Sequence, residues 1–181
     1  KPLNDKYNGK CFFINLGPTG IRARINKETP TQLLVKYVFQ DRLSPAAGKI
    51  EIGDVIIGAN GRLFKTPTVF HRKQGKRGWD GPPYDMAVAI EDSQGRDGRL
   101  VLTVLPGGKG GAKQVELQLK PVGRFSPTWP VDCPRSEKLL KRLVDHMLAS
   151  NPDKTRMWLR IQYTLALWAS GDPRAIPLVK E

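Results

Sequence analysis

Few side chains in this sequence could do acid–base or nucleophilic chemistry. There are two cysteines, Cys11 and Cys133, and two histidines, His71 and His146. The cysteines lie too far apart in sequence to form a clustered metal-ligand set. They are either two free thiols or one disulfide of an exported protein. His146 follows Asp145 on a predicted helix, where we expect a surface or interface side chain. No metal site is predicted.

The sequence also lacks the motifs of common catalytic centres. It contains no Gly-x-Ser-x-Gly, no His-Glu-x-x-His and no phosphate-binding loop. Residues 107–111, Gly-Gly-Lys-Gly-Gly, resemble a phosphate cradle in composition only, because they lie between two predicted strands rather than between a strand and a helix. We therefore predict a protein that is not an enzyme and that needs no cofactor.

The charge of the chain is strongly positive, at +13. Residues 1–123 carry 20 Lys and Arg against 11 Asp and Glu, and residues 124–181 carry 10 against 6. A local basic cluster comprises Arg72, Lys73, Lys76 and Arg77. It is either a solvated insertion or a contact for a polyanion. Because no nucleic-acid-binding motif accompanies it, nucleic acid is not an expected partner. No apolar run is long enough to span a membrane.

The first two-thirds of the chain is predicted to be mainly β. Residues Ile21–Ile25 alternate apolar and charged, which is typical of a strand with one buried face. The Asn60-Gly61 pair favours a tight reversal. Two helices are expected here: a single turn at 44–48 with Ser44 as its N-cap, and a longer helix over 84–93 that ends at Gly95. The other predicted strands are 11–14, 33–39, 54–59, 99–105 and 114–119.

The composition changes after Gly123. We predict an aromatic and proline-rich linker, 123–135, before a helical segment, 136–181, and we expect this segment to be the start of a helical repeat domain truncated at the C-terminus. Apolar residues recur at helical spacing over 136–150 and again over 155–169. On the second helix Trp158, Ile161, Leu165 and Trp168 share one side. Gly171 is its predicted C-cap, and Asp172-Pro173 begins a third helix. The short connections imply antiparallel neighbours.

Residues 10–122 resemble a PDZ domain. The block Leu43–Gly61, with its Ser-Pro-Ala-Ala-Gly turn, its Gly-Asp-Val-Ile strand and its Asn-Gly turn, matches the PDZ pattern, and the surrounding order of elements agrees. The hairpin over 99–119 is similar to that of PDZ modules in bacterial periplasmic proteases. The resemblance implies a mainly β fold with α: a partly open barrel or sandwich of five to seven strands with two helices, followed here by a C-terminal helical hairpin.

The resemblance also implies a function, β-augmentation by an extended peptide or protein C-terminus. The peptide carboxylate would be received by amides of the loop Pro18-Thr19-Gly20-Ile21, and an apolar C-terminal side chain is expected. A scaffolding role without peptide capture is the alternative. The implied peptide-binding residues come from the loop, the following strand and the helix that walls the groove: Thr19, Gly20, Ile21, Arg22, Ala23, Tyr84, Ala87 and Val88.

Residues 165–179 resemble the junction between units of a HEAT-like helical repeat, with Gly171–Pro177 as its core. The whole layout is similar to large exported bacterial proteins in which a PDZ module precedes an α-helical region, which implies an exported or periplasmic location. The helices are then either the start of a repeat region, which is itself a candidate partner of the PDZ module, or a cap on the sheet. The alternative function is a regulatory PDZ segment of a protease or other hydrolase whose catalytic domain lies outside this chain.

Overall fold

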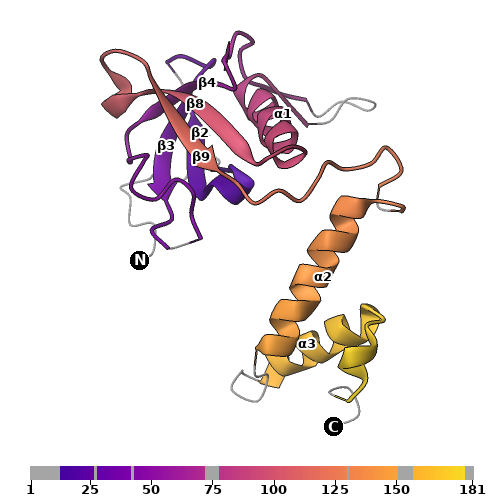
Figure 1. Cartoon of the computed structure of the whole chain (residues 1–181). Helices are drawn as coiled ribbons and strands as arrows, with labels where there is room; N and C mark the ends of the chain where they lie inside the picture. The colour runs from indigo at the N-terminus through magenta and orange to yellow at the C-terminus, as the bar shows by residue number, and fades with distance from the viewer. Residues whose placement is uncertain are drawn as a thin grey trace. The chain divides into compact units, whose positions relative to one another are not determined.

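The computed structural model describes residues 13–26, 28–41, 43–71, 78–129, 131–150 and 157–177. The chain divides into two compact units, Lys1–Pro121 and Val122–Glu181 (Figure 1). The first is built on an antiparallel sheet and the second on helices. The predicted fold class, mainly β with helices, is thereby confirmed. None of the helices among the described residues is both long and apolar enough to cross a bilayer.

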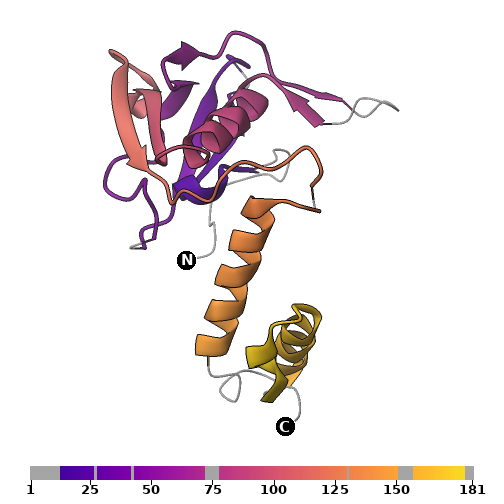
Figure 2. The ribbon, with the colours of Figure 1, turned by 45° about the vertical axis from the view of Figure 1, so that its right-hand side comes forward.

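One open sheet of seven strands forms the first unit. Its order is β1-β2-β3-β4-β8-β9, with β5 paired to β4, and all neighbours are antiparallel. The helix α1 lies against the sheet in both ribbon views (Figures 1 and 2). A small separate sheet pairs β6 with β7. The bounds are β1 Ile14–Asn15, β2 Ile21–Ile25, β3 Leu33–Val38, β4 Val55–Ala59, β5 Arg62–Leu63, β6 Val69–His71, β7 Gly78–Asp80, α1 Pro82–Gln94, β8 Arg99–Leu105 and β9 Lys113–Gln118.

The core lies between the sheet and α1. Because successive side chains of a strand point to opposite faces, Ile21 and Ala23 of β2 are fully buried while Arg22 and Arg24 are only half-buried. Met86 of α1 belongs to the same buried cluster. Each large aliphatic side chain removed from water in this way contributes about 1.5–3 kcal/mol. The alternation read from the sequence therefore fixes which face of β2 meets the helix.

The turn at Asn60-Gly61 forms as predicted, with φ of 49° and 77° at the two residues. The Asn60 side chain also links α1 to the sheet. Its amide Nδ2 donates to the Ala89 carbonyl (3.3 Å) and to Ser93 Oγ (3.2 Å), and its Oδ1 accepts the Val101 N–H (3.0 Å). One side chain therefore sets the position of the helix against β4 and β8.

Several stretches differ from the prediction. Strand β5 was not predicted, and the strand expected over 11–14 is β1, Ile14–Asn15, in the described residues. Residues 45–49 form successive turns rather than a helix, since Gly48 adopts φ of 70° and so leaves the helical region after three residues. The hairpin β6–β7 was missed, because the basic cluster between its strands carries no strand pattern. Residues 72–77, which include that cluster, lie outside the described residues, as does Cys11.

The second unit contains a helical hairpin. Helices α2 (Pro134–Ala149) and α3 (Met157–Ala169) form as predicted, and helical structure restarts at Asp172 as the 3-10 turn η4 (Pro173–Ala175). The two helices meet through a small apolar cluster in which Val144 and Met147 of α2 and Leu167 of α3 are buried, with Leu148 and Tyr163 packed against it.

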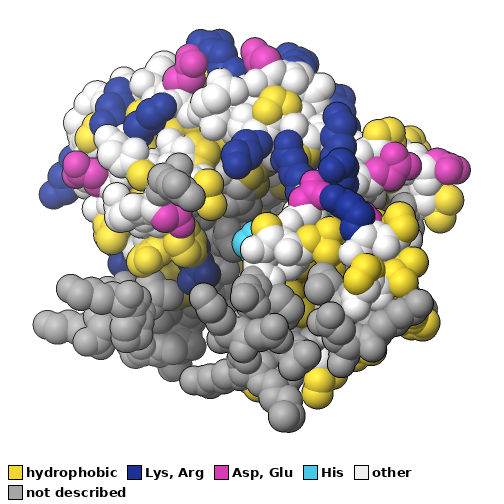
Figure 3. Space-filling view, turned by 60° about the horizontal axis from the view of Figure 1, so that its bottom comes forward, with side chains coloured by type: hydrophobic (Ala, Val, Ile, Leu, Met, Phe, Trp, Pro, Cys, Tyr) yellow, Lys and Arg dark blue, Asp and Glu magenta, His cyan; other side chains and the backbone are white. Residues whose placement is uncertain are grey.

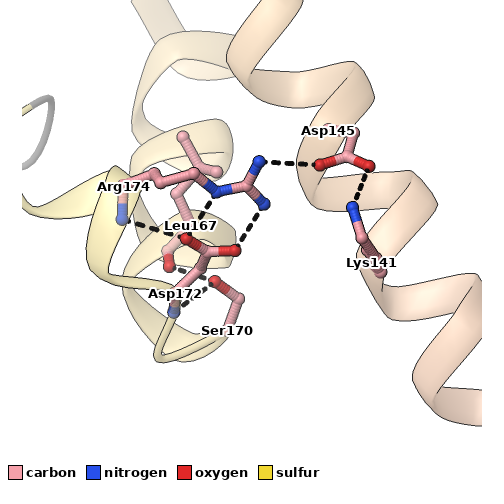
Figure 4. Close-up of polar contacts among 6 residues, drawn as sticks. All are labelled: Lys141, Asp145, Leu167, Ser170, Asp172 and Arg174. Atoms are coloured by element: carbon pink, nitrogen blue, oxygen red, sulfur yellow. Dashed lines mark hydrogen bonds and ion pairs between the residues drawn. The ribbon is translucent and has the colours of Figure 1, made fainter.

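An ion-pair network joins the turn η4, which follows α3, to α2 (Figure 4). The Arg174 guanidinium contacts Asp145 of α2 (2.9 Å) and Asp172 (2.6 Å), and Asp145 also contacts Lys141 (2.8 Å). Asp172 caps η4 by accepting the Arg174 N–H (2.9 Å). The hydrogen bonds from Arg174 lower the pKa of Asp172 to about 2. This network gives the Gly-Asp-Pro-Arg segment a structural role within the hairpin.

Candidate peptide-binding edge

The loop before β2 is a tight 3-10 turn, Gly17–Thr19, whose own groups occupy its amides. The Thr19 N–H donates to the Leu16 carbonyl (3.3 Å) and the Gly20 N–H to the Gly17 carbonyl (3.4 Å). The Ile21 N–H donates to Thr19 Oγ1 (3.1 Å), and that hydroxyl donates to the Leu16 carbonyl (3.0 Å). All three amides that the PDZ resemblance assigned to a carboxylate therefore have acceptors within the loop.

Both the backbone conformation of Gly20 and the space around it favour glycine over other residues. Its φ is 77°, and a Cβ at this position would collide with the Ser44 side chain. The Gly20 carbonyl accepts the Phe39 N–H (2.9 Å), and the Thr19 carbonyl accepts the Ala46 N–H (3.2 Å). The loop is thus fastened to the segment that follows β3. The Ser44 hydroxyl beside it is buried and has no hydrogen-bond partner among the described residues.

The outer edge of β2, opposite β3, is already paired. Ile14 of β1 lies opposite Ala23 and Asn15 lies opposite Arg22, in antiparallel register. The Leu16 N–H extends this pairing by donating to the Ile21 carbonyl (3.0 Å). The pairing of β1 stops at Ala23 in the described residues. The chain's own strand therefore covers the part of the edge where the predicted peptide would add.

The helix residues predicted to wall the groove lie on the exposed side of α1. Tyr84 is 59% and Val88 40% exposed, and Ala87 is exposed as well, whereas Met86 and Ile90 face the core. The helix begins at Pro82, whose missing N–H suits the first turn. These three side chains form an apolar surface on the helix.

Arg22 and Arg24 emerge on the face of β2 away from the core, as predicted. The Arg22 guanidinium lies over the Phe39 ring, 5.0 Å from its centroid, and Phe39 meets Tyr37 edge to face at 4.9 Å between centroids. Arg24 Nε is buried without a hydrogen-bond partner among the described residues. The eight predicted residues thus belong to three places: the loop, β2 and the exposed side of α1.

Outside this edge, Cys133 is the cysteine that lies among the described residues, and its thiol has hydrogen-bond partners. Cys133 is a free, buried thiol at the N-cap of α2. Hydrogen bonds from Ser136 and Ser126 lower the pKa of this thiol to about 6, against the opposing effect of burial. Among the described residues, no three His, Cys, Asp or Glu side chains gather where they could hold a metal ion.

Sequence reasoning missed three residues that shape this region. They are Asn60, which the sequence marked only as a turn residue, Ser44, which it marked as a helix cap, and Asp54. The buried Asp54 carboxylate accepts the Glu51 N–H (3.0 Å) and the Gly107 N–H (2.9 Å) and so joins two loops. The sequence does not indicate the contacts of Asn60 with Ala89, Ser93 and Val101 or that of Asp54 with Gly107, because these partners lie far away along the chain.

These residues define a class of structure. It is an antiparallel sheet with one helix on its core face and with a strand edge beside a tight loop. Comparisons with protein-family models, with curated proteins and with solved structures return no match.

Proposed function

We propose that the first unit is a non-catalytic module that binds an extended peptide or protein C-terminus as an antiparallel strand on the outer edge of β2, in place of β1. The observation that carries the proposal is that this edge already accepts a strand in the required orientation: Ile14 and Asn15 pair with Ala23 and Arg22. Main-chain pairing of this kind is indifferent to sequence, so another strand can take the same place.

The backbone pairing of β1 with this edge is short among the described residues, although Ile14 packs against the core and Leu16 is buried in it. The strand has two residues; Asn15 is exposed and Ile14 only half-buried. A backbone hydrogen bond contributes about 0.5–1.5 kcal/mol net to stability, so a pairing this short is weak. A ligand that forms a longer ladder than these two residue pairs would bind more tightly than β1 does.

The loop amides could donate their hydrogen bonds to a ligand carboxylate instead of to their present acceptors. The two backbone bonds of Thr19 and Gly20 are long, at 3.3 and 3.4 Å. Hydrogen bonds to an ionised acceptor are shorter and roughly twice as strong as bonds between neutral groups. The left-handed backbone at Gly20 is the feature that lets successive amides turn inward. The buried Ser44 hydroxyl beside it is an additional donor, for which the described part of the chain supplies no acceptor.

Specificity would come from the apolar side of α1. We assign Tyr84, Ala87 and Val88 to contacts with the ligand side chains and expect an apolar residue at the ligand C-terminus. Arg22 lies on the opposite face of β2 from the buried Ala23. It would contact an acidic ligand residue. This is the peptide-binding arrangement that the resemblance to PDZ domains implies.

Titration of the ¹⁵N-labelled chain with a library of C-terminal peptides tests the proposal. Peptides ending in Leu, Val, Ile or Phe should shift the amide signals of Gly20, Ile21 and Ala23 and those near Val88. The matched control is the same peptide with an amidated C-terminus, which removes the carboxylate and should bind at least about tenfold more weakly. If no peptide shifts the β2 signals while the protein stays folded, the proposal is wrong and this unit is a scaffold.

A further inference from the structure

Two arginines stand two residues apart on the outer face of β2. Arg22 and Arg24 are half-buried there, whereas Ile21 and Ala23 are fully buried on the core face. Alternate residues of a strand share one face and lie about 6.6 Å apart, because the rise is about 3.3 Å per residue. The outer face of β2 therefore presents two positive charges at the spacing with which alternate side chains of a neighbouring strand recur.

Within the described part of the chain, neither arginine forms an ion pair. The Arg22 guanidinium is held over the Phe39 ring, 5.0 Å from its centroid. Arg24 Nε is buried, and the described residues supply no acceptor for it. On β3, Tyr37 lies opposite Arg22 and Leu34 lies opposite Arg24, and neither is acidic. Because a buried donor without an acceptor is costly, a carboxylate beside these arginines would be stabilising.

Strand β1 shows where the side chains of a strand on this edge lie. Asn15 is opposite Arg22 and is exposed, and Ile14 is opposite Ala23 and packs against the core. Directly opposite residues of an antiparallel pair share a face, with Cβ atoms about 4.5–5.5 Å apart. A ligand strand that keeps this register and extends it by one pair places alternate side chains beside Arg22 and Arg24, and the one between them toward the core.

Charge indicates which peptides suit this edge. The chain carries +13, and Figure 3 shows Lys and Arg side chains (dark blue) at the surface at several places on the face in view. A positive chain attracts acidic ligands and repels basic ones. Opposite charges that face each other across two strands are favourable, whereas like charges are unfavourable. Because main-chain pairing does not select among sequences, the two arginines are the groups that can favour acidic peptides here.

We propose that the ligand of this edge is an acidic peptide with Asp or Glu second and fourth from its C-terminus, paired with Arg22 and Arg24. The residue in the place of Asn15 is the second from the end, because the ligand carboxylate is assigned to the loop that follows β1. This inference rests on the peptide binding proposed above. It adds the class of ligand, an alternation of acidic and apolar residues, to the apolar chain end already expected.

Three synthetic peptides test the proposal by calorimetric titration of the full chain. All end in Val and carry Ile third from the end, and they differ only in having Glu, Gln or Lys at the second and fourth positions. The Glu peptide should bind about three- to tenfold more tightly than the Gln peptide, since each cross-strand charge pair contributes up to about fivefold. The Lys peptide should bind most weakly. The advantage of Glu should shrink as salt is raised, because salt screens partly exposed charges.

Charge reversal separates contact with Arg22 from general attraction to a basic chain. Arg22→Glu should reverse the preference, so that a peptide with Lys second from the end binds more tightly than one with Glu. The matched control is Arg62→Glu, which makes the same change of charge on the exposed strand β5 and should keep the preference for Glu.

The outcomes distinguish this inference from the proposed function. Equal binding of the Glu and Gln peptides, or an equal effect of the two charge reversals, would overturn the acidic class of ligand. Shifts of the β2 amide signals by the Gln peptide would then still support peptide binding. If none of the three peptides shifts those signals while the protein stays folded, both the proposed function and this inference are wrong.

Discussion

Ile14 lies directly opposite Ala23, so the chain's own β1 covers the edge of β2 that we assign to a peptide. Replacing Ile14 by Pro removes one backbone donor, because proline has no N–H. It also disfavours the strand conformation at this position. We expect Ile14→Pro to free the edge, to tighten binding of an apolar-ended peptide several-fold, and to speed amide exchange at Ala23.

The control for this change is Ile14→Val, which keeps both the N–H and a β-branched side chain. It should leave peptide affinity and amide exchange close to those of the natural chain. Peptide binding that Ile14→Pro weakens, with the sheet intact, would contradict the idea that β1 competes with the ligand.

Asn60 should contribute to stability through its side chain. Asn60→Gly retains the positive φ of the turn but removes the contacts to Ala89, Ser93 and Val101. We expect the free energy of unfolding to fall by about 1–3 kcal/mol, since several part-buried hydrogen-bonding groups lose their partner. Urea unfolding measures this loss. Gly61→Ala is the comparison variant. It strains the turn without removing the Asn60 contacts, because φ at residue 61 is 77°.

Acid should loosen the helical hairpin through Asp172. Its pKa is about 2 in the folded chain, against an ordinary value of 3.8. A carboxyl whose pKa is lowered by folding adds stability above its unfolded pKa and loses that stability as the pH falls toward the folded pKa. The thermal stability of the hairpin, followed by far-ultraviolet circular dichroism, should therefore decline between about pH 4 and pH 2.

Asp172→Asn separates this effect from general acid denaturation. The variant keeps a capping oxygen for the Arg174 N–H but has no carboxyl to titrate. It should be less stable at pH 7 and show a shallower decline in acid. An unchanged decline would mean that other carboxyls are responsible.

Cys133 should titrate as an unusually acidic thiol. In the background of Cys11→Ser, thiolate absorbance near 240 nm should rise around pH 6, and Ser136→Ala should move that rise to higher pH, because the Ser136 hydroxyl is the first cause of the lowered pKa. Ser150→Ala, which removes a hydroxyl at the other end of α2, is the matched control. A thiol that titrates near its ordinary value of 9 in both proteins would contradict the assigned role of Ser136.

Local patterns were sufficient for most elements. The alternation over Ile21–Ile25 predicted both the bounds of β2 and its buried face, and the Asn60-Gly61 pair predicted the turn. Helix α3 likewise follows from its three- and four-residue spacing. These features depend on neighbours within a few positions, which the order of amino acids contains directly.

Tertiary structure alone decided what occupies the edge of β2 and what each polar group meets. The sequence predicted free amides at Thr19, Gly20 and Ile21, yet the turn closes on itself and β1 folds back over the edge. It placed the apolar residues of α3 that include Trp158 and Trp168 on one side of a helix but could not tell that α2 would pack on the other side. Pairing between distant segments depends on how the whole chain closes, and no periodicity along a single segment encodes that closure.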